Sequence, residues 1–313
     1  AAHVHAVPDT DSHAQALTVA GASGRLRSLT QGVRMAEYTH PELLVEPGWL
    51  AEHLDDPNVR VIDCAVLEAY RRAHIPGAVH LPVHYYIKED GPPGAEHGTF
   101  VMPPRQFEEL MGRLGVSNDT LVVPYDDNNH LVAARMWWVL KYYGHTNVKV
   151  LNGGWHRWLT EGRPATFHAA RPPKASFSAT PRPELVADAG YLKAKHTDPA
   201  CQVLDARTDG EWDGTNDRGN KRVGRVPGAR HLEWLRFVET ADTRRFLPAD
   251  ELERLLAEAG FERGRETVTY CQGGIRAAHA AFVMELLGWE HVRVYDGSMR
   301  DWANREDTPL TLE

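Results

Sequence analysis

The chain has 313 residues, of which 42% are hydrophobic and 25% are charged, and its formal net charge at pH 7 is -8. These values are typical of a globular protein with two domains of ordinary size, and they argue against a nucleic-acid partner, because phosphate binding requires a clustered basic face. The three cysteines, Cys64, Cys201 and Cys271, lie far apart without a CxxC pair. They suggest neither a disulfide framework nor a zinc knuckle, so we expect a reducing compartment and no metal site.

Residues 1–34 are rich in alanine, serine, glycine and histidine and have no clear period. We interpret them as a disordered leader or an artificial extension, since they lack the basic start and the apolar middle of a signal peptide. No stretch of the chain approaches the roughly 20 apolar residues that cross a bilayer. We therefore expect a cytoplasmic protein without a membrane partner.

In the first half of the chain, short β-branched runs alternate with longer segments of helical period. Strands are expected at 59–62 and 120–123, and helices at 104–114 and 133–143. The proline-rich residues 164–183 follow. We interpret them as a semi-rigid linker, because proline lacks an amide donor and favours extended backbone.

The second half repeats this alternation, with strands expected at 203–204 and 267–269 and helices at 248–259 and 276–287. Strands that alternate with helices predict an α/β fold, in which each half forms a parallel sheet flanked by helices. In such sheets, functional groups gather at the carboxyl ends of the strands, in the turns that lead into helices.

The two halves also share sequence segments in the same order, which indicates two homologous domains. The matched segments are 44–50 with 185–192, 74–81 with 225–232, 121–126 with 267–271, and 148–154 with 292–298. We therefore expect one domain at 35–163 and a second domain at 184–313, on either side of the linker.

Cys271 follows an expected strand and precedes an expected helix, so its sulfur should lie at a helix N-terminus. Unpaired backbone amides and the helix dipole stabilise negative charge there and lower the pKa of a thiol from about 8.5. Gly273 and Gly274 permit positive φ, which lets successive amides curl around the sulfur, and Arg276 adds a permanent cation. The combination favours a thiolate nucleophile over the alternative of a small buried hydrophobic residue.

Residues 271–277, Cys-Gln-Gly-Gly-Ile-Arg-Ala, resemble the active-site loop of rhodaneses. Residues 205–211, 224–229 and 294–302 resemble further elements of that family in their usual order, and the resemblance covers roughly 42–310. It implies tandem rhodanese-like domains and a sulfurtransferase that carries a sulfane sulfur as a persulfide on its loop cysteine, without a metal or an organic cofactor. The sulfur is expected to come from a small donor such as thiosulfate and to pass to cyanide or a thiol acceptor.

We expect Cys271 to be the catalytic nucleophile. Arg276 is the first candidate to hold the anionic group of the donor, since a planar guanidinium suits oxyanions, and Arg207 is the second. An ion pair between Arg207 and Glu211 that braces the fold is the alternative for Arg207, while His279 is expected to be a helix-surface histidine without a role. The full set of expected substrate-binding residues is Arg276, Arg207, Gln272, Gly273, Gly274 and Ile275.

The first domain has the loop but not the nucleophile, because Asp126 stands where Cys271 stands in the second domain. A carboxylate cannot form a persulfide. We therefore expect this domain to be catalytically silent and to cover the cleft that leads to Cys271. The other two cysteines are expected to be structural.

Three alternatives to a thiosulfate sulfurtransferase stay open. A cysteine-based phosphatase has five residues between its cysteine and its arginine, whereas four separate Cys271 from Arg276. A non-catalytic binding module is the second alternative, and the presence of both residues argues against it. The third is a 3-mercaptopyruvate sulfurtransferase. Within the family that the chain resembles, thiosulfate enzymes commonly have basic residues inside the loop and 3-mercaptopyruvate enzymes often have Cys-Gly-Ser-Gly-Val-Thr-Ala, and residues 271–277 match neither pattern. The lack of that Ser and Thr favours thiosulfate, as does Glu211 at a site where 3-mercaptopyruvate enzymes tend to have a carboxylate-binding arginine.

Overall fold

A computed structural model describes residues 37–83, 87–90 and 98–313. Residues 35–313 belong to one compact unit. The interpretation of residues 1–34 as a leader or an artificial extension lies outside the described residues.

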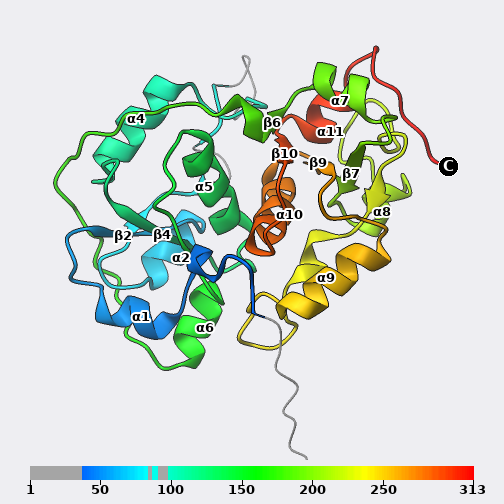
Figure 1. The fold of residues 1–313 in the computed structure, drawn as a ribbon. Helices are drawn as coiled ribbons and strands as arrows, with labels where there is room; N and C mark the ends of the chain where they lie inside the picture. Colours follow the sequence, from blue (N-terminus) through cyan, green and yellow to red (C-terminus); the bar gives the residue numbers. More distant parts are fainter. Residues whose placement is uncertain (1–36, 84–86, 91–97) are drawn as a thin grey trace, which may run out of the picture. The chain divides into compact units, whose positions relative to one another are not determined.

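The first half of the chain alternates strands and helices as expected (Figure 1). Its strands are β1 (Leu44–Val45), β2 (Val59–Asp63), β3 (Val79–His80), β4 (Leu121–Tyr125) and β5 (Val150–Leu151). Its helices include α1 (Pro47–Glu52), α2 (Leu67–Arg72), α4 (Pro104–Arg113), α5 (Leu131–Tyr142) and α6 (Gly154–Thr160). A short 3-10 helix, η1 (Pro41–Leu43), precedes β1.

The second half has the same succession of elements. Its strands are β6 (Val186–Ala187), β7 (Cys201–Asp205), β8 (Arg230–His231), β9 (Glu266–Tyr270) and β10 (Val292–Tyr295). Its helices are α7 (Ala189–Lys195), α8 (Asp209–Trp212), α9 (Ala249–Glu258), α10 (Ile275–Leu286) and α11 (Ser298–Trp302), with 3-10 helices η2 (Pro183–Leu185) and η3 (Trp234–Phe237). Every strand and helix expected from the sequence is present, and the ends differ by at most a few residues.

The two sheets have one topology. In the second half the strand order is β6-β10-β9-β7-β8, and all neighbouring strands are parallel. In the first half β3-β2-β4 and β1-β5 form separate parallel groups, and a parallel bridge between Val122 and Val148 connects them. The first half therefore follows the order β1-β5-β4-β2-β3, which is the same order. The predicted α/β fold with tandem domains is confirmed.

A buried tyrosine and a buried aspartate show the repeat at the level of side chains. The Tyr125 hydroxyl at the end of β4 donates to Asp63 Oδ2 at 2.5 Å, and the Tyr270 hydroxyl at the end of β9 donates to Asp205 Oδ2 at 2.5 Å. Each bond joins the central strand of its sheet to the neighbouring strand, β4 to β2 and β9 to β7, at their carboxyl ends. The bonds hold in place the edge from which the loops after β4 and β9 depart.

Helices α5 and α10 pack side by side between the two sheets (Figure 1). Both are apolar on almost every side, and a helix of this kind is stable only when other parts of the protein surround it. The rings of Trp137 in α5 and Phe282 in α10 meet edge to face at a centroid distance of 4.9 Å. One hydrophobic core therefore continues from the first half of the chain into the second.

Residues between α6 and η2, within the expected linker, run along the first half of the chain without helix or strand. The amides of Ala175, Thr180 and Arg182 donate to backbone carbonyls at the ends of α4 and α5. Backbone hydrogen bonds and proline stiffness thus both fix this segment. The domain bounds given above remain a prediction.

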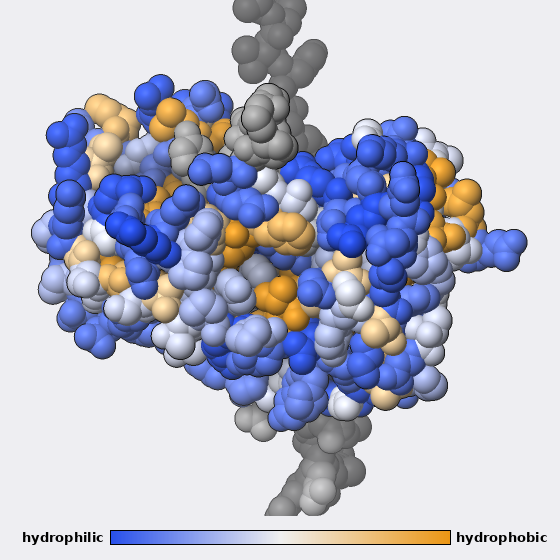
Figure 2. All heavy atoms as spheres, turned by 90° about the horizontal axis from the view of Figure 1, so that it is seen from above, coloured by the Kyte–Doolittle hydropathy of each residue, from blue (hydrophilic) through white to orange (hydrophobic). Residues whose placement is uncertain are grey.

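Hydrophilic residues cover most of the face that Figure 2 shows, with smaller hydrophobic areas near its middle and towards its left and right edges. The larger hydrophobic side chains that are exposed include Phe100, Leu159, Phe167, Leu235 and Leu312. In the part of the chain that the structure describes, no helix has the length and hydropathy that crossing a bilayer requires.

The contact between α5 and α10 predicts the effect of Phe282→Ala. Phe282 is fully buried between Trp137 and Phe246, so the substitution leaves a cavity and should lower the free energy of unfolding by about 3–5 kcal/mol. Urea unfolding followed by circular dichroism measures the change. Leu159→Ala, at a side chain that is 47% exposed, is the matched control and should change it by less than about 0.5 kcal/mol. Equal effects of the two substitutions would contradict this account of the interface.

Candidate active site

Cys271 lies directly after β9, four residues before the start of α10, and it is 1% exposed. Gly274 closes the turn with a φ of 84°, and a Cβ atom there would lie 2.5 Å from Asp296 Oδ1. Only glycine tolerates both the left-handed conformation and this close approach. Of the two loop glycines, Gly274 alone has a positive φ, and the amides of both glycines act on the Cys271 sulfur.

The surroundings of Cys271 favour its thiolate. Burial would raise the pKa of the thiol, but the charge of Arg276 and the backbone amides of Ala277 and Gly273 outweigh burial and hold the pKa below its ordinary value. The loop thus activates a sulfur atom that burial alone would keep protonated.

The other two cysteines provide an internal comparison. Cys64 and Cys201 are also free, buried thiols. Burial, reinforced by nearby carboxylates, raises the pKa of Cys64 far above its ordinary value and the pKa of Cys201 to about 11. Both sites therefore suit the expected structural role, and the loop rather than burial distinguishes Cys271.

Ser298, at the start of α11, lies beneath the loop, and the sequence assigned it no role. Its hydroxyl oxygen accepts hydrogen bonds from the amides of Cys271 at 3.0 Å and Gly274 at 3.1 Å, and its hydroxyl donates to the carbonyl of Tyr295 at 2.7 Å. Ser298 thereby fixes both ends of the turn that holds the sulfur. Comparison of the two repeats could have identified Ser298, because the matching position in the first domain is Gly154, which has no hydroxyl group.

Arg276 makes a two-pronged ion pair with Glu211. Its Nη1 lies 2.6 Å from Oε2 and its Nη2 lies 2.8 Å from Oε1. The same carboxylate caps α8 by accepting from Thr208, whose Oγ1 is 2.9 Å away. Burial opposes ionisation of Glu211, but the bonds from Arg276 and Thr208 prevail and lower its pKa to about 2. The expected ion pair between Glu211 and Arg207 was wrong, because Glu211 orients the loop arginine.

Arg207 instead braces the end of the sheet. It is 2% exposed, its Nη2 lies 2.7 Å from Asp205 Oδ2, and its Nε lies 3.0 Å from both oxygens of that carboxylate. Nη2 also donates to the carbonyl of Gly224 at 3.1 Å. Its guanidinium is therefore engaged beneath the site, next to the bond between Tyr270 and Asp205.

His279 is fully buried, so the expectation of a helix-surface histidine was wrong. Its Nε2 lies 3.2 Å from the carbonyl of Asn129 in the first half of the chain, and its ring packs against Trp234 and Phe246. Burial lowers its pKa to about 3, which keeps the ring neutral. The sequence showed only that His279 follows Arg276 by one helical turn. Its burial depends on the packing of α10 against α5.

A cavity of about 290 Å³ opens onto the loop. Five of the expected site residues line it, namely Cys271, Gln272, Gly273, Ile275 and Arg276. Gly274 lies behind the loop, where its carbonyl faces Arg135 Nη1 at 3.4 Å. The structure thus brings together most of the residues that the sequence nominated.

The cavity also contains residues that the sequence did not nominate. The first half of the chain contributes Lys88 and Leu131, and the second half contributes Thr208, Glu211, Asn216, Arg218 and Arg300. Thr208, Glu211 and Arg300 lie in the segments 205–211 and 294–302 that resemble family elements. No local motif marks the others, because they reach the cavity from separate loops. Lys88 and Leu131 can be recognised as cavity residues only from the packing of the two halves of the chain.

A second polar cavity, of about 420 Å³, continues from the first and shares Asn216, Arg218, Gln272 and Arg300 with it. The side-chain amides of Gln272 and Asn220 bond reciprocally, at 3.0 Å in each direction. The loop that follows α8 is thereby tied to the residue next to Cys271.

In the first domain, the loop that corresponds to the Cys271 loop surrounds the side-chain carboxylate of Asp126. Asp126 follows β4 as Cys271 follows β9, and its carboxylate accepts four backbone amides at 2.8–3.0 Å. One donor is Ala133, the third residue of α5, which corresponds to Ala277 in α10. Burial is the larger effect and raises the pKa of Asp126 to about 6, while the amides of Ala133, Asn128 and Val132 act in the opposite direction and favour the carboxylate.

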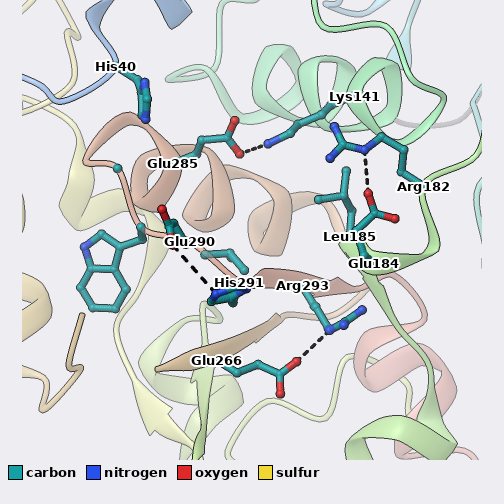
Figure 3. A pocket seen from close by; sticks show the side chains of 13 residues that line it. His40, Lys141, Arg182, Glu184, Leu185, Glu266, Glu285, Glu290, His291 and Arg293 are labelled. Carbon is teal, nitrogen blue, oxygen red and sulfur yellow. Dashed lines mark hydrogen bonds and ion pairs between the residues drawn. The ribbon is translucent and has the colours of Figure 1, made fainter. Parts of the chain in front are cut away.

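A larger cavity, of about 610 Å³, lies elsewhere and is lined mainly by charged side chains (Figure 3). Its charged side chains pair in Lys141–Glu285, Arg182–Glu184 and Arg293–Glu266, and the imidazole of His291 lies 3.9 Å from Glu290. Across 37–83, 87–90 and 98–313, no group of three or more His, Cys, Asp or Glu side chains is arranged to hold a metal ion. The sulfur of Cys271 belongs to the smaller cavity.

Comparison with known proteins agrees with this geometry. The family model of the rhodanese-like domain matches residues 46–161 and 188–305. The "Sulfur carrier protein TtuD" of Thermus thermophilus is 34% identical over 297 residues, which cover 87% of this chain and 98% of that protein. A "Thiosulfate sulfurtransferase" of Corynebacterium glutamicum is 33% identical, with 88% and 92% covered.

Among solved structures, SseA from Escherichia coli, described as a 3-mercaptopyruvate sulfotransferase, superposes with a TM-score of 0.73 at 27% identity. The match covers 82% of this chain and 98% of SseA. The family model matches both halves of the chain, and the fold and the cysteine loop are those expected of its members. The chain therefore belongs to the rhodanese-like family and is a sulfurtransferase with two rhodanese-like domains.

Proposed function

We propose that the protein transfers a sulfane sulfur from thiosulfate to cyanide or a thiol acceptor through a persulfide on Cys271. The Cys271 thiolate attacks the outer sulfur of thiosulfate, a sulfur–sulfur bond forms, and the bond to the sulfonate sulfur breaks with its electron pair leaving on sulfite. The acceptor then attacks the outer sulfur of the persulfide, and the Cys271 thiolate leaves. This double displacement is covalent catalysis, and its electrons balance without a further reactant.

The Asp126 loop is the observation that carries this proposal. Four backbone amides bind the Asp126 carboxylate in the first domain, and the corresponding loop in the second domain holds a sulfur in the same place. The same arrangement of amides suits the thiolate and the persulfide, because both are anions. The lowered pKa of Cys271 supports this interpretation.

The charge of the cavity supports an anionic donor. A thiolate and thiosulfate repel each other, so their approach requires compensating positive charge. Lys88, Arg218, Arg276 and Arg300 line the cavity, with Glu211 as the acidic residue among the lining side chains. The formal excess of positive charge favours a dianion beside the sulfur.

The assignment of thiosulfate rests on Glu211. A 3-mercaptopyruvate donor carries a carboxylate, and the position at which we expect a carboxylate-binding arginine for that donor holds Glu211, which accepts from both terminal nitrogens of Arg276. The name of the Corynebacterium glutamicum relative also supports thiosulfate. The similarity to SseA favours 3-mercaptopyruvate, which is therefore the second candidate.

Cys271→Ser tests the nucleophile. We expect formation of thiocyanate from thiosulfate and cyanide to fall by about 10³-fold or more, because a serine hydroxyl cannot carry a sulfane sulfur. Cys201→Ser is the matched control and should retain the activity of the unmodified protein. Activity that survives in Cys271→Ser would contradict the proposal. A larger kcat/KM with 3-mercaptopyruvate than with thiosulfate would show that 3-mercaptopyruvate is the donor.

Arg276→Lys tests the orientation of the loop cation. Lysine keeps the charge but cannot form the two-pronged pair with Glu211, so kcat/KM for thiosulfate should fall by about 10-fold. Arg293→Lys alters a comparable arginine, paired with Glu266 in the cavity of Figure 3, and should leave the rate unchanged. Equal rates for Arg276→Lys and the unmodified protein would show that the planar fork is not required.

A further inference from the structure

Lys88 brings a positive charge from the first domain into the cavity of Cys271. Its ammonium group donates to the carbonyl of Thr99 at 2.5 Å and to Asp296 Oδ1 at 3.2 Å. An antiparallel bridge pairs the backbone of Lys88 with that of Val101. The side chain is only 3% exposed, yet Lys88 lines the same cavity as Cys271. The charge is therefore fixed in place at the site.

A second cation shares the same carboxylate. Arg135 in α5 places its Nη2 2.5 Å from Asp296 Oδ1 and its Nη1 3.4 Å from the carbonyl of Gly274, in the Cys271 loop. The side chain of Arg135 is fully buried, and that of Asp296 is 5% exposed. Lys88, Arg135 and Asp296 thus form a buried cluster with two cations and one carboxylate.

The excess positive charge of this cluster needs a counter-anion. A buried charge without a partner is costly, because it has lost its water and gained no compensation. Besides burial, the largest electrostatic effects on the pKa of Lys88 come from Asp296, Arg135 and Cys271, and Cys271 contributes negative charge only as its thiolate. A Cys271 anion, in the cavity that Lys88 also lines, would supply this counter-charge.

We propose that Lys88, held by Asp296, is a positioning residue whose ammonium group stabilises the Cys271 anion and orients the anionic donor from across the domain interface. The first domain, whose own loop carries Asp126, thereby supplies part of the electrostatics of the site. For the donor and the persulfide this inference rests on the proposed function. The effect of Lys88 on the Cys271 thiolate does not depend on the proposed function.

The inference predicts that sulfur loading from thiosulfate depends on pH in the alkaline range. Burial lowers the pKa of Lys88 from 10.5 to about 8, against the opposing effect of Asp296. Because a lysine is charged below its pKa, the ammonium group is present at neutral pH and is lost as the pH rises through about 8. Sulfur loading from thiosulfate should therefore decline on the alkaline side of this value.

The first test measures the Cys271 thiol without any sulfur donor. The pH dependence of alkylation by iodoacetamide, followed by mass spectrometry of the peptide that contains Cys271, reports its thiolate. Lys88→Met should raise the apparent pKa and slow alkylation at neutral pH by about 3- to 10-fold. Lys141→Met removes another lysine that pairs across the interface, with Glu285, away from this cavity. This control should leave the alkylation profile unchanged.

The second test uses Lys88→Arg, whose charge persists at all accessible pH values. The Lys88→Arg variant should have the same low pKa at Cys271 as the wild-type protein. Its sulfur loading should not show the alkaline decline that we expect for the wild-type protein. An alkylation profile in Lys88→Met equal to that of the unmodified protein would overturn the inference. If Lys88→Met fails to fold, the absence of an alkaline decline in the unmodified protein would overturn it instead.

These outcomes separate the inference from the proposed function. If the shift in thiol pKa appears but no sulfur is loaded from thiosulfate, the role of Lys88 toward the thiolate stands and the donor assignment fails. If sulfur is loaded normally and Lys88→Met has an unchanged thiol pKa and an unchanged KM for thiosulfate, the inference fails alone.

Discussion

A buried anion at the end of the central strand of each sheet is the constraint on which the rest of the site depends. Backbone amides at the start of the following helix stabilise it, and they can do so because the loop curls tightly before the helix begins. In the first domain the anion is the carboxylate of Asp126, and it is bound by four amides. In the second domain the matching atom is the sulfur of Cys271. One loop conformation therefore holds a carboxylate in one copy and, in the other, the thiol that we propose as the nucleophile.

The surrounding structure keeps that loop in shape. Gly274 must be glycine because Asp296 approaches its α-carbon and its φ is positive. The hydroxyl of Ser298 binds both ends of the turn, and Glu211 fixes the guanidinium of Arg276. These contacts originate in the second domain. Contacts within the second domain therefore account for most of the conformation of the Cys271 loop, and the first domain contributes charge.

The first domain does more than cover the cleft. Its helix α5 packs along α10, and this contact buries His279 and places Arg135 next to the carbonyl of Gly274. The same packing brings Lys88 into the cavity. A domain without a nucleophile can therefore influence the reactive sulfur through charge.

The sequence predicted the fold well, because alternating strands and helices and an internal repeat are local patterns. It also nominated Cys271 and Arg276, since a strand, a glycine pair and a helix place them near each other along the chain. It failed for Glu211, which it paired with Arg207, because the choice between two arginines depends on how the loop after β7 meets α10. Lys88 carried no signal, because its role exists only in the packed structure.

The most direct test of the account is the intact mass of the protein after incubation with thiosulfate, with the modified peptide then identified. The account predicts a mass gain of one sulfur atom on Cys271, lost on addition of cyanide and absent in Cys271→Ser. A mass that does not change with thiosulfate or with 3-mercaptopyruvate, or a sulfur found on Cys64 or Cys201, would contradict the persulfide mechanism.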